Sequence, residues 1–476
     1  MPDLRRQIFE SGKTTSRKAA SREASRATSR ASSKPTSRQS SRAASRQPSD
    51  DEDAGYLSDE TAMSIGSLDD ENPEQDNVDW PQELADRIQE ILDRKRSSVQ
   101  GREEALAAFC RLTKYHYAVE EIYASVTDLL AAFARSVRSD SARETTLALR
   151  AIELLAITAS DDKVFENTEP LLTRTIQDSS SNAVKSAAIQ CLSACTIFGG
   201  AGEDGILDQM TFLLDIVASD GQSINAPDDP LSVTAALQAW GFLAAEIEDF
   251  EDESEESVQI LMDQLESGDS AVQIAAGENI ALLYEKSYTP QEDDDDEGEE
   301  DSEDSDEHET ATNGPKLVKR YNAYHNTPEL ERQLQSLAHV HSKTISKRDK
   351  KSLHSNFASI LTTVENPRRG PRYNMAINQD TNRHYGSTLT VKIGRHGVMS
   401  IDRWWKWTRL TALRRILQGG FTEHYYQGNR AVLNNLPVML RSAEPSHGTV
   451  DRQSAKKAAK MRNSRRWTAQ DSDEED

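Results

Sequence analysis

The chain has 476 residues, of which 36% are hydrophobic and 6% aromatic, and its 80 acidic residues outnumber its 56 basic ones. These fractions are low for one compact domain of this length, so part of the chain is expected to lie outside any core. No apolar run could span a membrane, no secretory signal is recognisable and three cysteines cannot form a disulfide framework, which predicts a cytoplasmic and nuclear protein.

Residues 1–78 form an arm that is predicted to be disordered. Its first 49 residues contain 12 basic and 3 acidic residues, and the rest of the arm is acidic. Such a composition buries too little apolar area to offset chain entropy. The arm is either a solubilising tail or a basic segment whose charge would be cancelled by phosphorylation. The candidate regulatory residues are the serines that precede arginine, Ser16, Ser21, Ser25, Ser29, Ser37, Ser41 and Ser45, and the serines that precede acidic residues, Ser49 and Ser58.

Residues 79–288 are predicted to form an armadillo/HEAT-like helical-repeat solenoid, so the expected fold class is all-α. Apolar residues recur at steps of three and four, and a small residue followed by an apolar stretch returns five times. The copies begin at Ala105, Ala151, Ala188, Ala236 and Ala276, at spacings of 46, 37, 48 and 40 residues that suit such repeats. Asp229 and Asp269 are predicted to lie at helix starts as capping residues.

The alanines also predict the interior of the stack, because only small side chains let two crossing helices approach closely. The large residues near them should fill the layers between units; they are Leu154, Leu155, Leu192, Trp240, Phe242, Ile280 and Leu283. Residues 50–291 contain 49 acidic and 15 basic residues. We therefore expect the solenoid to bind basic proteins, or the chain's own basic tail, rather than naked nucleic acid.

Residues 289–314 are predicted to be an acidic low-complexity linker. Between residues 292 and 309 there are 14 acidic residues and no lysine or arginine, and their repulsion should keep the segment extended. The simpler interpretation is a solvated spacer. The alternative is a mimic of the phosphate backbone that occupies the basic C-terminal region, in which case removing the segment would strengthen RNA binding.

No catalytic motif is present, and neither a cofactor, a metal ion nor a small-molecule substrate is expected. The glycine-rich phosphate loops, the zinc-protease helix and the serine-hydrolase elbow are all missing from the sequence. Cys191 and Cys195 lie four residues apart without further ligands, so they are predicted to be core residues. His339 and His341 are predicted to be surface histidines.

Residues 315–440 are predicted to be a small, basic and mostly helical region, followed by a basic and then acidic tail over residues 441–476. Residues 315–470 contain 29 basic and 9 acidic residues. Residues 343–364 begin with lysines and arginines and continue as an amphipathic helix, and residues 388–401 alternate as a hairpin would. The apolar residues of that amphipathic helix are Leu353, Phe357, Ile360, Leu361 and Val364.

Residues 402–418 are predicted to form a basic helix with Asp402 as its cap and Gly419-Gly420 as its stop. Its apolar stripe comprises Trp404, Trp407, Leu410, Leu413 and Leu417. A packed stripe explains these tryptophans more simply than an aromatic cage. Residues 452–466 contain seven basic residues and no acidic one, and their alanines favour a helix once the charge is neutralised.

This density of lysine and arginine attracts phosphates through counterion release, and nearby aromatic residues could stack on unpaired RNA bases. A nuclear-import signal and contact with chromatin or other proteins are the alternatives. The candidate nucleic-acid-binding residues are Lys343, Lys347, Arg348, Lys350, Lys351, Arg403, Lys406, Arg409, Arg414, Arg415, Lys456, Lys457, Lys460, Arg462, Arg465 and Arg466.

Two sequence blocks follow the repeats: KRDKKSLHSNFASIL (347–361) and SIDRWWKWTRLTALRRILQGGFTEHY (400–425). With helical repeats first and these two blocks after them, the chain resembles a fungal member of the interferon-related developmental regulator family. The resemblance implies a non-catalytic regulator. It also implies an association either with ribosomes and translational control or with transcriptional co-repression through histone-deacetylase complexes.

The hypothesis favoured by the basic C-terminal region is a translational regulator that binds ribosomes or rRNA. In this hypothesis the repeats dock on the ribosomal surface, and the basic C-terminal helices enter an rRNA-lined channel. The alternative is a nuclear co-regulator scaffold whose helical repeats bind subunits of histone-deacetylase complexes.

Overall fold

The computed structural model describes residues 79–93, 97–291, 317–339, 347–378, 383–393 and 397–442. The N-terminal arm with its candidate serines, most of the acidic linker and the C-terminal tail lie outside these described residues. Over the described ranges the chain is mainly helical, as predicted.

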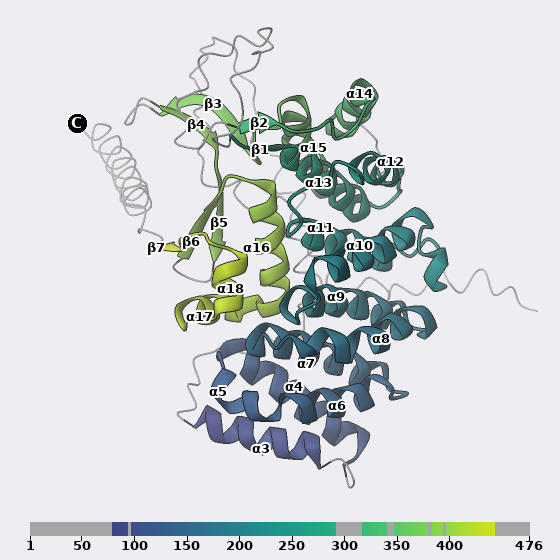
Figure 1. The fold of residues 1–476 in the computed structure, drawn as a ribbon, viewed down its shortest axis with the longest axis vertical. Helices are drawn as coiled ribbons and strands as arrows, with labels where there is room; N and C mark the ends of the chain where they lie inside the picture. The colour runs from purple at the N-terminus through teal and green to yellow at the C-terminus, as the bar shows by residue number, and fades with distance from the viewer. Residues whose placement is uncertain are drawn as a thin grey trace, which may run out of the picture. The chain divides into compact units, whose positions relative to one another are not determined.

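Twelve of the described helices form six consecutive pairs (Figure 1). The first members of the pairs are α3 (Trp80–Leu92), α6 (Val126–Val137), α8 (Lys163–Asp178), α10 (Gly202–Ala218), α12 (Ser254–Gln264) and α14 (Thr327–Ala338). The second members are α4 (Val99–Tyr115), α7 (Ala142–Ala159), α9 (Asn182–Phe198), α11 (Pro230–Ala244), α13 (Ser270–Lys286) and α15 (Lys347–Glu365). Each second helix packs on the next one in chain order, so these six helices form a continuous inner layer and the solenoid is confirmed.

Short helical segments connect some of the pairs. They are α5 (Val119–Ile122), η2 (Tyr123–Ser125) and η3 (Gln222–Ile224). The described part of the chain contains no helix that is both long and apolar enough to cross a bilayer.

The five sequence copies all fall on inner helices, which confirms the predicted repeat. Ala105 lies on α4, Ala151 on α7, Ala188 on α9, Ala236 on α11 and Ala276 on α13, and all five are buried. The predicted layer residues, from Leu154 to Leu283, are buried as well. Small residues therefore face neighbouring helices, and large ones fill the layers between them.

Side-chain caps start four of the inner helices. Ser98 accepts a hydrogen bond from the Gly101 amide at 3.0 Å, and Ser141 begins α7 in the same way. Asp229 accepts from the Ser232 amide at 2.9 Å, and Asp269 from the Ala271 amide at 2.8 Å, as predicted from their positions. Each cap satisfies a first-turn amide that has no partner within its own helix.

The three cysteines are free thiols within the core, which confirms the interpretation of Cys191 and Cys195 as core residues. Both lie on α9 with no exposed area. Burial raises the pKa of the Cys110 thiol to about 12, so this side chain stays protonated and unreactive at neutral pH.

The stack continues past the predicted end of the repeat region at residue 288. Strand β1 (Tyr288–Pro290) pairs antiparallel with β2 (Leu317–Lys319), so the two ends of the acidic segment lie side by side. The α14–α15 pair then packs on α13 as a sixth unit. The acidic segment is therefore an insertion between two units of one stack, and residues assigned by sequence to the C-terminal region belong to the solenoid.

Helix α15 packs as its amphipathic pattern predicts. Leu353, Phe357, Ile360 and Val364 are buried, and Leu361 is partly buried against the same core. Gly277 of α13 lies beneath this helix, where an added Cβ would be only 2.8 Å from Ile360 and 2.9 Å from Phe357. Glycine at this position allows the fifth and sixth units to approach closely.

The remaining elements form a third layer that contains more strand than predicted. Strands β3 (Tyr373–Asn378) and β4 (Arg383–Ser387) pair with each other, and β5 (Leu389–Ile393), β6 (Gly397–Ile401) and β7 (Arg441–Ser442) form a three-stranded sheet. The β5–β6 pair, in the register Leu389↔Ile401, confirms the predicted hairpin. Helices α16 (Trp404–Leu417), α17 (Phe421–Tyr426) and α18 (Arg430–Asn435) and the turn η4 (Gln418–Gly420) complete this layer.

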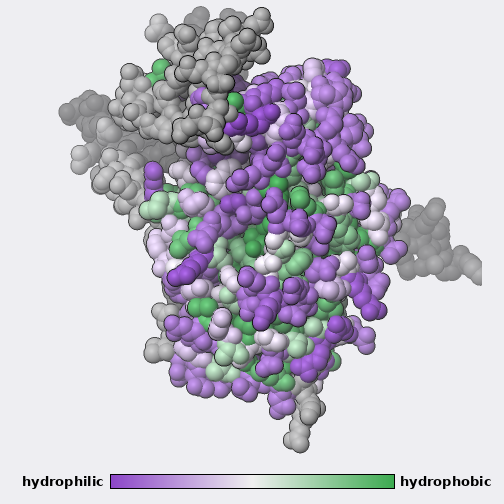
Figure 2. Space-filling view, in the orientation of Figure 1, coloured by the Kyte–Doolittle hydropathy of each residue, from purple (hydrophilic) through white to green (hydrophobic). Residues whose placement is uncertain are grey.

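Helix α16 lies on the inner layer, on the side away from α8, α10 and α12 (Figure 1). It contacts α7, α11 and α13, and α17 continues to α4. Figure 2 shows that the face seen here is mostly hydrophilic over α12, α14 and α15, in keeping with the charge of the chain. The basic helix therefore covers part of the acidic solenoid.

Candidate nucleic-acid interface

The apolar side of α16 is buried against the solenoid, as the sequence pattern predicted. Trp404, Trp407, Leu410, Leu413 and Leu417 are all at most 3% exposed. The Trp404 indole N–H donates to the Thr363 hydroxyl of α15 at 2.7 Å, which satisfies its only polar atom. Helix α16 is thus a core element, and its exposed surface is correspondingly small.

The start of α16 is capped by a carboxylate from another helix. Glu285 of α13 accepts hydrogen bonds from the amides of Trp404 at 2.9 Å and Trp405 at 3.1 Å. Burial raises the pKa of this carboxyl, while Arg403 and the two amides favour its charged form. Asp402, the predicted cap, instead binds the Lys406 ammonium at 2.7 Å. The prediction was wrong because the true cap lies 119 residues away in sequence.

Arg415 binds the solenoid rather than facing solvent. Its guanidinium donates to Glu153 of α7 at 2.8 Å, and the same carboxylate binds Arg150 at 2.7 Å. Arg150 also donates to the Ile416 carbonyl. Because Arg415 is only 9% exposed, we remove it from the candidate nucleic-acid contacts.

Arg409 also binds the solenoid, just beyond the end of α11. It binds Glu246 at 2.9 Å and donates to the carbonyls of Ala245 and Asn435, each at 2.9 Å. Burial raises the pKa of Glu246, and Arg409 opposes this rise. The acidic solenoid thus binds the chain's own basic helix α16, and Arg409, like Arg415, is not a candidate nucleic-acid contact.

The other basic residues of α16 are partly buried. Arg403 donates to the Arg368 carbonyl at 3.4 Å, and Lys406 is bound to Asp402. Arg414 lies in the last turn of the helix, near its negative dipole end. The predicted entry of this helix into an rRNA channel is therefore incompatible with its packing.

Helices α17 and α18 attach the third layer to the first two units. His424 is buried, with Nε2 donating to the Thr113 carbonyl of α4 at 3.0 Å and Nδ1 accepting from Asn429 at 3.0 Å. Burial lowers the pKa of His424 to about 4, so the ring is neutral at physiological pH. Asn429 also donates to the Ile157 carbonyl of α7 at 3.1 Å. These bonds link two inner helices through one short segment.

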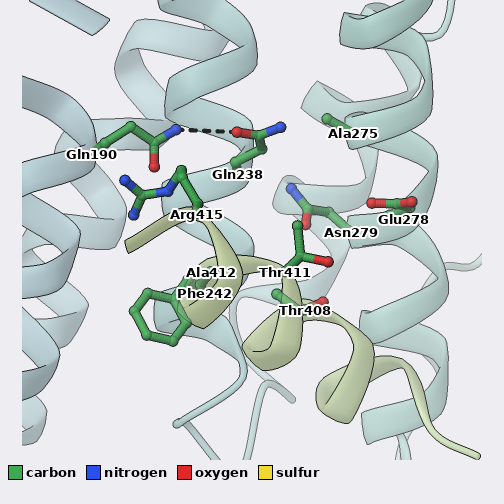
Figure 3. Close-up of a pocket in the computed structure, with 10 residues that line it drawn as sticks. All are labelled: Gln190, Gln238, Phe242, Ala275, Glu278, Asn279, Thr408, Thr411, Ala412 and Arg415. Carbon is green, nitrogen blue, oxygen red and sulfur yellow. Dashed lines mark hydrogen bonds between the residues drawn. The ribbon is translucent and has the colours of Figure 1, made fainter. Parts of the chain in front are cut away.

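The seam between α16 and the solenoid contains a cavity of about 30 Å³ that is lined by polar side chains and by Phe242, Ala275 and Ala412 (Figure 3). Gln190 of α9 donates to Gln238 of α11 at 3.1 Å, and Asn279 of α13 donates to the Leu237 carbonyl at 2.8 Å. Glu278 accepts from the Trp407 indole at 3.2 Å. The cavity is about the size of one water molecule, so it is a packing feature rather than a ligand site.

Glu278 makes the stability of this seam depend on pH. Burial raises its pKa to about 8, and the Trp407 hydrogen bond offsets this only in part. Between about pH 4.5 and pH 8 the folded state therefore binds a proton that the unfolded state has released, so stability falls as the pH rises through this window. Glu278→Gln keeps the accepting oxygen and is expected to flatten this slope, raising the Tm more at pH 8 than at pH 5.

Thermal unfolding at a series of pH values measures this effect, with Glu256→Gln on the exposed face of α12 as the matched control. A Glu278→Gln protein whose pH profile equals that of the wild type would contradict the assignment.

The protein-family model described as interferon-related developmental regulator (IFRD) matches residues 39–365, which is more than half of the chain. The chain belongs to the interferon-related developmental regulator family. An uncharacterized protein of Schizosaccharomyces pombe is 28% identical over 365 residues, which cover 76% of each chain.

The family match ends at Glu365, the last residue of α15. It therefore takes in all six helix pairs of this family member, including the sixth pair beyond the acidic insertion. The third layer, with the block at residues 400–425, lies C-terminal to the match.

The remaining candidate residues of this family member lie at the start of α15 or outside the described ranges. Lys350 is half-buried and Lys351 is exposed, both near the start of α15, and Lys347 and Arg348 begin that helix. Lys343 and the six tail residues from Lys456 to Arg466 lie outside the described ranges. His339 is exposed at the end of α14, as predicted, and His341 is not described.

The acidic residues that bind α16 were missed by sequence reasoning. Glu153, Glu246 and Glu285 carry no local motif, and only the overall acidity of residues 50–291 pointed to them. In the described ranges no group of three or more His, Cys, Asp or Glu residues is arranged to bind a metal ion.

Proposed function

We propose that this family member is a non-catalytic regulator that binds ribosomes through rRNA and modulates translation, acting in the cytoplasm and the nucleus. The observation that carries the proposal is the basic start of α15. Lys347, Arg348, Lys350 and Lys351 lie within its first five residues, with Asp349 as the only acid among them. The helix dipole is also positive at this end of a helix, so the basic side chains add to its positive charge. A phosphate bound here would reduce the repulsion among these positive charges.

The packing of α16 reduces the number of candidate residues that are proposed to contact rRNA. Arg409 and Arg415 are bound to solenoid carboxylates, so their charge is already neutralised. The start of α15 and the tail at residues 452–466 are therefore the proposed rRNA contacts, and the tail is the segment proposed to enter an rRNA channel. Contacts of this kind act mainly through phosphates and are sensitive to salt.

Sucrose-gradient sedimentation with purified ribosomes tests this proposal. Deleting residues 452–466, or combining Lys350→Glu with Lys351→Glu, is expected to weaken co-sedimentation at least tenfold and to make the salt dependence of binding shallower, by about one unit of slope per lost phosphate contact.

The matched control reverses the same amount of charge elsewhere, with Lys163→Glu and Arg174→Glu, because both side chains are exposed on α8. It should sediment like the wild type. Full co-sedimentation of both the deletion and the α15 variant would refute the proposal.

The second candidate function is a nuclear co-regulator scaffold. The observation in its favour is the exposed acidic surface of the outer helices, which includes Glu203 and Asp204 on α10 and Glu256 and Asp263 on α12. Because α16 contacts α7, α11 and α13, a basic protein or a deacetylase-complex subunit would have to bind these outer helices. A set of bound proteins that is insensitive to RNase and rich in deacetylase subunits would favour this function over ribosome binding.

A further inference from the structure

The β3–β4 hairpin presents unusual residues to solvent. Met375, Ile377 and Tyr385 are 60%, 54% and 44% exposed, and they are three of the eight exposed large hydrophobic residues in the described ranges. Green atoms are visible in Figure 2 at the upper left, where Figure 1 places these strands. Neither strand pairs with a third within the part of the chain that the structure describes. A two-stranded ribbon with apolar side chains in water is only marginally stable alone, so its base must be anchored.

Several contacts fix that base to the rest of the molecule. The Gly370 amide donates to the Ser387 hydroxyl at 2.7 Å, and the Arg372 amide donates to Ser359 of α15 at 3.0 Å. A Cβ at Gly370 would lie only 2.0 Å from the Asp402 carbonyl oxygen, so the backbone passes directly against the segment that leads into α16. The base is therefore rigid, while residues 374–377 are exposed.

The charge around this ribbon is mainly positive. Residues 365–388 contain four arginines and two acidic residues, Glu365 and Asp380. Arg368 is exposed and lies 6.0 Å from the ring of Tyr288, and Arg369 lies over the ring of Tyr373 at 4.8 Å. Arginine binds phosphate through a planar, bidentate group, and stacking on an aromatic ring holds that group in place.

We propose that the β3–β4 ribbon is an RNA-binding element, in which Tyr385 stacks on an unpaired base and the arginines at its base bind the adjoining phosphates. The proposal rests on the proposed ribosome binding and adds a specific contact to it. The side chains suit RNA because Asn374, His384 and Tyr385 offer hydrogen-bond donors and acceptors next to apolar surface, with positive charge behind them. A basic protein partner is disfavoured by the same charge.

The test uses the full-length chain with purified ribosomes. The ribbon variant combines Met375→Ser, Ile377→Ser and Tyr385→Ser, and Tyr385→Ala alone is the milder form. The control combines Leu231→Ser, Tyr426→Ser and Met439→Ser, whose side chains are 58%, 64% and 75% exposed and lie outside the ribbon. Loss of base stacking should weaken binding by the ribbon variant about 5- to 100-fold without changing the slope of log K against log salt, because no charge is removed. The control should bind like the wild type.

Ultraviolet crosslinking followed by mass spectrometry identifies the contact directly, and nucleotide adducts on the peptide that contains Tyr385 are expected. If the wild type binds ribosomes but carries no adduct on that peptide, and the ribbon variant binds equally well, the ribbon proposal fails and the proposed function stands. Crosslinks from the ribbon to ribosomal proteins alone would also overturn it, in favour of a protein contact. A wild-type chain that does not bind ribosomes would overturn both proposals.

Discussion

Glu153→Ala is expected to lower the free energy of unfolding by about 3–5 kcal/mol, as is found when one partner of a buried ion pair is removed. Glu153 is 4% exposed and binds Arg150 within α7 and Arg415 across the seam between α7 and α16. Without this carboxylate, the guanidinium of Arg415 remains buried with no opposite charge. Chemical denaturation of the full chain, followed by circular dichroism, measures the change.

Two variants identify the cause of this loss. Asp178→Ala breaks an ion pair of similar length, 3.1 Å to Arg174, whose side chains are 67% and 81% exposed, and it should change stability by less than about 1 kcal/mol. Combining Glu153→Ala with Arg415→Met removes both buried charges and should recover part of the loss. A Glu153→Ala protein as stable as the wild type would show that Arg415 does not need this carboxylate.

Gly420→Ala is expected to detach the third layer from the first unit and to cost about 3 kcal/mol or more, at the upper end of overpacking effects. An added Cβ would lie 1.7 Å from the Lys114 carbonyl oxygen at the end of α4, and backbone atoms cannot yield as a flexible side chain does. The φ of Gly420 is −85°, which alanine adopts readily, so the effect is one of space alone.

The neighbouring glycine provides the control for this variant. A Cβ at Gly419 would lie 3.3 Å from the Tyr115 hydroxyl, so Gly419→Ala needs only a small shift and should leave stability nearly unchanged. Hydrogen exchange is the second measurement, and the amides of α17 should exchange faster in Gly420→Ala than in Gly419→Ala. Equal exchange in the two variants would argue that α4 and η4 can separate without cost.

Local patterns predicted the solenoid well because its helices follow from nearby residues. The alanine copies, the caps Asp229 and Asp269, and the stripe of α16 are all readable from spacing alone, and the structure confirms them. The β3–β4 ribbon was missed because its asparagines, alanine and glycine are poor strand formers. The β5–β6 hairpin was found because Val391 and Ile393 alternate with polar residues.

The candidate site was harder to predict because a sequence shows which residues are charged but does not show which distant residue each of them binds. Arg409 and Arg415 have the same local signature as nucleic-acid contacts, but their carboxylates come from 163 and 262 residues away. The role of Gly420 was also only partly predicted. The sequence indicated that a helix stops there, and the structure adds that its backbone passes against the end of α4. Long-range pairing of this kind has no local periodicity.

The third layer has a mechanical consequence for the solenoid. In a solenoid whose helix pairs contact only their nearest neighbours, the stack can bend and twist between any two units. Here residues 404–436 also contact α13, α11, α7 and α4 in turn, so one segment connects units that do not touch each other. Because these units are tied to one continuous segment, bending the stack between its first and fifth units would require contacts of residues 404–436 to break.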